Sequence, residues 1–88
     1  MLWYNLFMKY YVYIVRCSDD TLYTGITTNL DRRICEHNGE GNLGAKYTKV
    51  RRPVELVYKS NFIGRSEASK EEARIKKMSR KNKEELIK

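Results

Sequence analysis

The sequence predicts a small α+β domain, with strands and helices in separate stretches of the chain. Runs of β-branched and aromatic residues flank a turn-forming stretch between residues 10 and 25, a pattern that is typical of a β-hairpin. Helical patterns with start and stop residues follow from residue 28 and from residue 66. A chain of 88 residues has room for one modest core.

The predicted hairpin carries one tyrosine on each arm, Tyr13 and Tyr23. Whether the two phenols share a face depends on the register of the strands. A two-residue turn at residues 19–20 would place them on opposite faces, whereas a three-residue loop at residues 19–21 would place them on the same face. The hairpin pattern by itself leaves both registers open.

A helix is predicted after the hairpin, with Thr28 and Asp31 as a capping-box-like start and Asn38-Gly39 as a stop. The following residues, 39–44, form a glycine-rich loop. This loop lacks the spacing of a phosphate-binding P-loop, and no Gly-Lys-Ser/Thr follows it.

Within this helix, Leu30 and Ile34 lie four residues apart and define the predicted buried stripe. Arg33 and His37 have the same spacing and share a face beside that stripe. Spacing alone favours a solvated arginine and a histidine that interacts with the helix dipole.

A basic segment at residues 45–52 includes an aromatic ring and a hydroxyl group. This mixture suits phosphate contacts with one stacking platform, and it suits an ordinary surface loop equally well. The candidate nucleic-acid-binding residues are Lys46, Tyr47, Lys49, Arg51 and Arg52.

A third strand is predicted at residues 53–59, with Val54, Leu56 and Tyr58 as its core face, and a connection at 61–64. Ser66 is the candidate N-cap of the next helix. Ser79 restarts or kinks that helix, and residues 86–87 close the core.

Glu72 lies within the helical stripe that is expected to face the sheet. An inward carboxylate is costly unless a cation or a metal pairs with it. On the residues alone, a salt bridge between Glu72 and a basic neighbour is slightly favoured over a metal site.

The formal net charge of +7 favours acidic partners, nucleic acid first and an anionic membrane second, although a solvated basic face explains it equally well. Cys17 and Cys35 form no CxxC motif and are interpreted as reduced intracellular thiols. No stretch is long enough to span a membrane, so a cytoplasmic location is expected. Residues 1–8 are interpreted as an N-terminal extension, in which Trp3 or Phe7 packs against the sheet.

The order of these features resembles the GIY-YIG nuclease family. Tyr11-Val12-Tyr13 stands where its first motif stands, Tyr23-Thr24-Gly25 where its second stands, and the segment 28–33 looks like the family helix that ends in a catalytic arginine. The resemblance runs from about Lys9 to Ile87. It is closest to a small stand-alone group that often carries LYTGITxxLxRR, HNxGxGAKYT and RRPVELVY. Tyr11 and Thr24 depart from the motifs, and the glycine-rich loop is about two residues longer.

The resemblance implies a fold and a set of roles over residues 9–88. The fold would be a three-stranded antiparallel sheet flanked by helices. A tyrosine, Tyr13 or Tyr23, would act as base or orient the water, Arg33 would stabilise phosphate charge, and His37 would orient the water or touch phosphate. Glu72 would hold Mg²⁺ (or Mn²⁺). A common target for these groups favours the three-residue loop, with Asp20 near the turn position where relatives often have glycine.

The implied function is a metal-dependent DNA endonuclease, structure-selective or weakly sequence-specific, in DNA repair or recombination. DNA rather than RNA is the expected partner, with no membrane. The alternative is a nucleic-acid-binding module of the same fold that cleaves little or nothing. A third hypothesis is a protein-interaction adaptor that uses the apolar N-terminal residues.

Overall fold

The computed structural model describes residues 8–39 and 44–88. The predicted packing of Trp3 or Phe7 and the middle of the glycine-rich loop lie outside the described residues. In the described part of the chain, no helix has the length and apolar character that a membrane span needs. The elements are β1 (Lys9–Arg16), β2 (Leu22–Thr27), α2 (Leu30–His37), α3 (Lys46–Lys49), β3 (Glu55–Ile63), α4 (Arg65–Lys76) and α5 (Arg80–Ile87).

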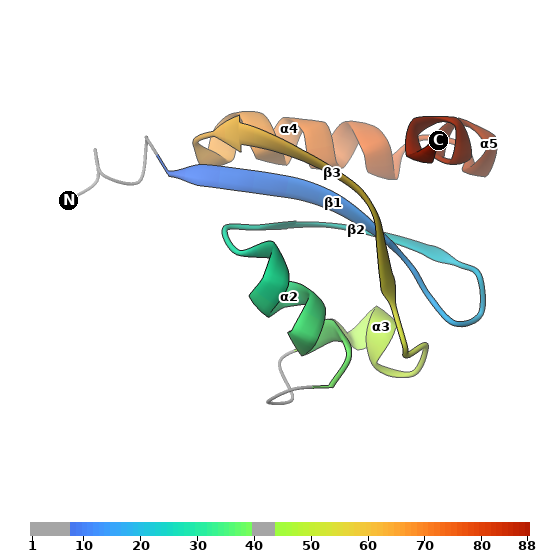
Figure 1. Ribbon diagram of the computed structural model, residues 1–88. Coiled ribbons are helices and arrows are strands. Elements are labelled where there is room, and N and C mark those ends of the chain that lie inside the picture. Colours follow the sequence, from blue (N-terminus) through green and yellow to red (C-terminus); the bar gives the residue numbers. More distant parts are fainter. Residues whose placement is uncertain (1–7, 40–43) are drawn as a thin grey trace.

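The three strands form one antiparallel sheet in the order β2-β1-β3. Figure 1 shows α4 and α5 along one face of this sheet and α2 with α3 on the other. The predicted three-stranded antiparallel sheet flanked by helices is therefore confirmed. In the central strand, alternate side chains point to opposite faces, so β1 supplies residues to both layers of helices.

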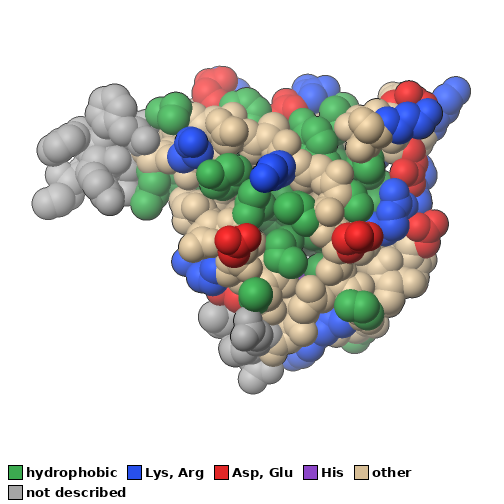
Figure 2. All heavy atoms as spheres, viewed as in Figure 1, with side chains coloured by type: hydrophobic (Ala, Val, Ile, Leu, Met, Phe, Trp, Pro, Cys, Tyr) green, Lys and Arg blue, Asp and Glu red, His purple; other side chains and the backbone are tan. Residues whose placement is uncertain are grey.

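Two hydrophobic clusters fill the two sides of the sheet. On the α4 side, the buried members are Val12, Ile14, Ala68 and Ile75. On the α2 side, they are Tyr13, Val15, Cys17 and Val54, with Leu30 and Ile34 packed against them as predicted. Figure 2 shows further hydrophobic side chains over the middle of the visible face, with charged side chains around them.

Two predicted helix starts are wrong by one or two residues. The N-cap of α2 is Asn29 rather than Thr28, because the Asn29 side chain accepts a hydrogen bond from the Arg32 backbone N–H at 3.0 Å. The helix α4 begins at Arg65 after Gly64, so Ser66 lies inside the first turn. The predicted stop after His37 and the restart at Ser79 are confirmed.

The third strand differs from its prediction in length and in alternation. It continues to Ile63 because the first half of the long strand β1 pairs with the segment that was expected to be a connection. A register irregularity between Ile14 and Val15 places Tyr58 opposite Ile14 and Leu56 opposite Val15. Leu56 and Tyr58 therefore face opposite sides, and no single alternating core face exists.

Candidate active site

Tyr13 and Tyr23 lie on the same face of the hairpin, as predicted. Tyr23 pairs with Val15, which shares a face of β1 with Tyr13. Tyr13 itself pairs with Gly25, and its ring crosses that glycine. A Cβ atom on Gly25 would lie 2.6 Å from Cζ of Tyr13. The glycine therefore leaves the space in which the Tyr13 ring reaches the β2 edge of the sheet.

The loop that sets this register is three residues long but begins one residue earlier than predicted. The backbone N–H of Cys17 donates to the Thr21 carbonyl at 2.8 Å, which leaves residues 18–20 as the loop. Asp20 has a φ of 69°, the left-handed conformation that glycine adopts most easily. The prediction that Asp20 occupies the strained turn position is confirmed.

His37 is fully buried and contacts hydrogen-bonding partners through both ring nitrogens. Its Nε2 lies 2.7 Å from the Tyr13 hydroxyl, and its Nδ1 lies 2.7 Å from Oγ1 of Thr48. Thr48 donates its single hydroxyl hydrogen to the Ala45 carbonyl at 3.1 Å, so it has to accept from Nδ1. A neutral imidazole that donates from Nδ1 accepts at Nε2. The hydrogen bonds therefore run from Tyr13 to His37 to Thr48.

Burial keeps Tyr13 and His37, the two ionisable groups of these hydrogen bonds, uncharged near neutral pH. It raises the pKa of Tyr13 to about 12, while a hydrogen bond from the Arg33 guanidinium acts in the opposite direction. Burial also lowers the pKa of His37 to about 4, and the positive charge of Arg33 adds to that decrease. The directions of the pKa shifts agree with the directions of the hydrogen bonds.

Arg33 is held between the phenol and a carboxylate. Its Nη1 lies 2.9 Å from Oε1 of Glu36, and its guanidinium also hydrogen-bonds to Tyr13. Nε of Arg32 lies 3.5 Å from the second oxygen of Glu36. One half-buried carboxylate therefore positions two guanidinium groups, and a net positive charge remains beside Tyr13.

Tyr23 belongs to a stack of rings rather than to the hydrogen-bonded chain. Its ring meets the edge of His37 with centroids 5.3 Å apart and stacks on Tyr47 at 5.7 Å. The Arg51 guanidinium lies over the ring of Tyr47, 4.0 Å from the ring centroid. This arrangement gives Tyr23 a packing contact with His37 and distinguishes it from Tyr13.

A family model described as the GIY-YIG catalytic domain matches residues 9–85 of the chain. The chain belongs to the GIY-YIG family. A UPF0213 protein of Desulfotalea psychrophila is 57% identical over 79 residues, which are 90% of this chain and 71% of that protein. A UPF0213 protein of Staphylococcus haemolyticus is 54% identical over 79 residues, 90% of this chain and 94% of that protein.

Solved structures of similar chains have the same fold. The solution structure of a UPF0213 protein from Bacillus halodurans has a TM-score of 0.58 and 45% identity, and the match covers 91% of this chain and 83% of that one. The solution structure of a protein from E. faecalis has a TM-score of 0.61 and 44% identity, over 90% of this chain and 82% of that one. Membership of the GIY-YIG family implies a nuclease domain, nucleic acid as its substrate in general, and general dependence on a divalent metal.

Glu72 approaches the GIY-YIG tyrosine from α4, on the other face of the sheet. Its negative charge contributes to the raised pKa of Tyr13, so the carboxylate lies within electrostatic reach of the phenol. Nζ of Lys76 lies 3.2 Å from Oε2 of Glu72, which confirms the expected salt bridge to a basic neighbour. The Glu72 carboxylate therefore already lies beside a positive charge, that of Lys76.

The donor set at Glu72 fits one kind of metal site and not another. Among the described residues, no group of three or more His, Cys, Asp or Glu side chains could enclose a metal ion. Mg²⁺ commonly binds through one or two carboxylates together with substrate phosphates and water. A single, partly buried Glu72 fits that second arrangement.

The five predicted nucleic-acid-binding residues have different surroundings. Lys46, Lys49 and Tyr47 are exposed on α3. Arg51 pairs with Asp19 at 3.1 Å as well as stacking on Tyr47. Arg52, in contrast, donates from Nε to the His37 carbonyl at 2.9 Å, which caps the C-terminus of α2. Arg52 therefore has a contact that supports the candidate site from within the protein.

Thr48 is the residue of this site that the sequence analysis missed. The segment around it was interpreted as either a phosphate-contacting segment or a surface loop, but Thr48 has no exposed surface and lies in the short helix α3. The Thr48 hydroxyl, between Lys46 and Lys49, was visible in the sequence. Its partner, His37, is eleven residues away and could not be assigned from spacing.

Proposed function

We propose that this protein is a metal-dependent DNA endonuclease that hydrolyses phosphodiester bonds, structure-selective or weakly sequence-specific, with a role in DNA repair or recombination. We also propose that it acts in the cytoplasm. The observation that supports the proposal most strongly is the chain of hydrogen bonds from Tyr13 through His37 to Thr48 beside Arg33. It supplies a proton acceptor and a cation at one place.

In this mechanism Tyr13 passes a proton rather than holding a negative charge. Its hydroxyl donates to His37 and accepts from Arg33, which leaves one lone pair for a water molecule. As the water oxygen attacks phosphorus, its proton moves to Tyr13 and the phenol proton moves to Nε2 of His37. The bond from phosphorus to the leaving oxygen breaks, and the leaving oxygen takes a proton from solvent.

The pKa values favour this relay over a free phenolate. At pH 7, ionising a phenol of pKa about 12 costs roughly 7 kcal/mol, whereas protonating an imidazole of pKa about 4 costs roughly 4 kcal/mol. His37 is therefore the less costly final acceptor of the proton. Thr48 holds the imidazole in the tautomer that can accept it.

Charge on the phosphate is neutralised by two further groups. Arg33 lies beside Tyr13 and can stabilise the charge that develops on the phosphate oxygens. Glu72 would hold Mg²⁺ or Mn²⁺, and the ion would supply additional charge neutralisation when bound. Glu72 would then exchange its contact with Lys76 for the ion.

The test compares two neighbouring carboxylates. We expect Glu72→Gln to abolish Mg²⁺- or Mn²⁺-dependent cleavage of flapped, branched and single-stranded DNA, whereas Glu71→Gln retains it. Glu71 is a matched control because it pairs with Arg74 on the same helix. Equal cleavage by the wild type and Glu72→Gln would exclude the metal role of Glu72.

One observation favours the alternative of a binding module without cleavage. Tyr13 is only 1% exposed, so its hydroxyl has little contact with solvent water, which the proposed hydrolysis needs. If the wild type binds these DNA substrates but cuts none of them with Mg²⁺ or Mn²⁺, the binding module is the better description.

A further inference from the structure

Two hollows lie beside the candidate active site, and each has a volume of about 370 Å³. Thr28, at the turn between β2 and α2, lines both of them. The arginine hollow is lined by Tyr10, Ile26, Thr27, Thr28, Arg32, Arg33, Glu36 and Arg65. The tyrosine hollow is lined by Tyr11, Thr28, Asn29, Leu30, Asp31 and Lys59. Because Thr28 lines both hollows, they adjoin at the turn between β2 and α2, and the two together are called the groove.

The arginine hollow is strongly positive. Arg32 and Arg33 reach it from α2 and Arg65 from α4, while Glu36 is the single carboxylate in its lining. Glu36 already pairs with both arginines of α2, and no ion pair joins Arg65 to another described residue. Three guanidinium groups against one carboxylate leave a net charge that suits a phosphate group.

The positions along α4 relate this hollow to the proposed metal residue. Arg65 and Glu72 are seven residues apart, which places them on the same helix face about 10 Å from one another. Arg33 contacts Tyr13 and also lines the arginine hollow. A phosphate in this hollow would therefore be a neighbour of the phosphate that is cut.

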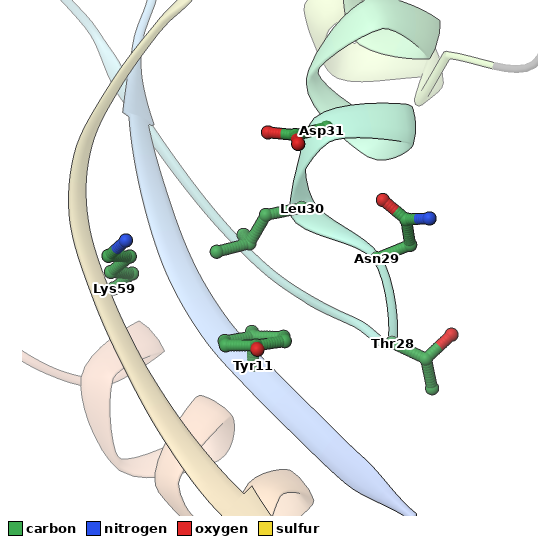
Figure 3. Close-up of a pocket in the computed structure, with 6 residues that line it drawn as sticks. All are labelled: Tyr11, Thr28, Asn29, Leu30, Asp31 and Lys59. Atoms are coloured by element: carbon green, nitrogen blue, oxygen red, sulfur yellow. The ribbon is translucent and has the colours of Figure 1, made fainter.

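The tyrosine hollow offers an aromatic ring and polar groups at the other end of the groove. Figure 3 shows Tyr11 and Leu30 reaching into the space between the sheet and α2, with Lys59 on β3 and Asp31 on α2 at its borders. The side chains of Thr28 and Asn29 point away from this space. Tyr11 lies two residues before Tyr13 on the same face of β1, which is about 6.6 Å along the strand.

We propose that this groove binds an unpaired segment of DNA beside the cleavage site, with a phosphate in the arginine hollow and a base stacked on Tyr11. Single-stranded nucleic acid is commonly bound by a positive groove combined with aromatic platforms. The arginine hollow provides the positive charge, and the adjoining tyrosine hollow provides the aromatic ring. Lys59 and Asp31 provide a donor and an acceptor for the edge of the base. The inference rests on the proposed nuclease function and names its substrate class: DNA with unpaired nucleotides next to the scissile bond.

The phosphate part is tested by binding in EDTA, where no metal-dependent cleavage occurs. We expect Arg65→Ala to weaken binding of a fluorescein-labelled oligo-dT of about eight nucleotides and to reduce the slope of log affinity against log salt by about 0.7, the value of one phosphate contact in single strands. Arg74→Ala is the matched control, because Arg74 is nine residues from Arg65, which places it on the opposite side of the helix, and it pairs with Glu71. Equal slopes for the two variants would overturn the phosphate site.

The base part is tested with an abasic oligonucleotide of the same length. The wild type and Tyr11→Phe should prefer oligo-dT to the abasic strand, whereas Tyr11→Ala should lose about 5- to 150-fold of affinity for oligo-dT, as for one stacked base. Its affinity for the abasic strand should not change. A Tyr11→Ala variant that keeps the full preference for oligo-dT would exclude the stacking site.

These measurements separate the inference from the function on which it rests. If Glu72-dependent cleavage is present but Arg65→Ala and Tyr11→Ala bind like the wild type, the proposed nuclease function holds and the groove assignment is wrong. If both variants behave as expected and no cleavage is found, the groove assignment holds for a binding module.

Discussion

The two faces of the central strand β1 bury different chemistry. On the α4 side, β1 contributes Val12 and Ile14 to a cluster of aliphatic side chains. On the α2 side, it contributes Val15 and Tyr13, and the phenol continues into the buried pair of His37 and Thr48. The same strand therefore stabilises the fold from one face and builds the candidate site from the other.

The difference shows how each layer satisfies its polar groups. The buried hydroxyl and imidazole groups on the α2 side hydrogen-bond to one another and end on the Ala45 carbonyl. Among the described residues, the one buried side-chain polar atom without a hydrogen-bond partner is Oγ of Ser60. In the sheet, Ser60 lies opposite Val12 of β1, so its side chain faces the α4 side. Loss of one group on the α2 side leaves others unpaired, whereas loss on the α4 side leaves a cavity.

Between the two faces of β1, the largest effect is expected on activity from Tyr13→Phe. Without the hydroxyl, no proton can pass to His37, so cleavage of flapped or single-stranded DNA should fall by about 100- to 10,000-fold. The control is Tyr58→Phe, because Tyr58 packs against the α4-side cluster and should keep wild-type cleavage. Full activity of Tyr13→Phe would contradict the proposed relay.

The next largest effect is expected on stability from Ile75→Ala, on the α4 side. Ile75 is fully buried, so its truncation should decrease the free energy of unfolding by about 2–5 kcal/mol. Urea denaturation measures this change, and Ile75→Val, with an expected loss of about 0.5–1.5 kcal/mol, serves if the alanine variant does not fold. Ile63→Ala is the control, since Ile63 is 59% exposed. Equal losses for Ile75→Ala and Ile63→Ala would contradict the assigned core.

The α2 side should respond to pH. His37 has a folded-state pKa of about 4, below the ordinary value of 6.5, so protons bind the unfolded chain more tightly. The stability from its neutral burial is complete above pH 6.5 and is lost as the pH falls from 6.5 to 4, by about 3 kcal/mol in total. Urea denaturation across this range measures the loss.

His37→Gln is the control for this pH dependence, because His37 is the only histidine of the chain. The variant should show a flat stability between pH 6.5 and 5. Glu84 titrates lower, since hydrogen bonds from Arg16 and Arg80 lower its pKa to about 2, and its contribution is lost only below pH 4.5. An unchanged slope in His37→Gln would assign the pH dependence to other groups.

The smallest effect is expected from Thr48→Val, which removes the acceptor for Nδ1 of His37 with little change of shape. The unpaired ring nitrogen should cost about 1–3 kcal/mol of stability, and cleavage should decrease because the tautomer is no longer held. Thr48→Ser keeps the hydroxyl and should therefore keep both the stability and the cleavage of the wild type. Ring nitrogen chemical shifts of His37 report the tautomer, and an unchanged shift in Thr48→Val would contradict the positioning role.

Local patterns predicted the secondary structure well where one segment determined its own conformation. The hairpin, the helix around Leu30 and Ile34 and the break at Ser79 follow from turn residues, spacing and caps. The end of β3 was mispredicted because its second half is a strand only through pairing with β1. The alternation of Leu56 and Tyr58 failed for a similar reason, because the register irregularity belongs to the strand pair and not to one sequence.

The motifs of the sequence determined the family and the residue types of the candidate site, since tyrosines, arginine, histidine and glutamate occur in a recognisable order. Tertiary structure alone decided which tyrosine donates to His37 and that Thr48 completes the chain. It also decided that Arg65 lines the same hollow as Arg33 and that Tyr11 lines the adjoining one. The physical reason is that hydrogen-bond direction, burial and pKa depend on atoms brought together from distant segments, and a linear pattern carries no distances between them.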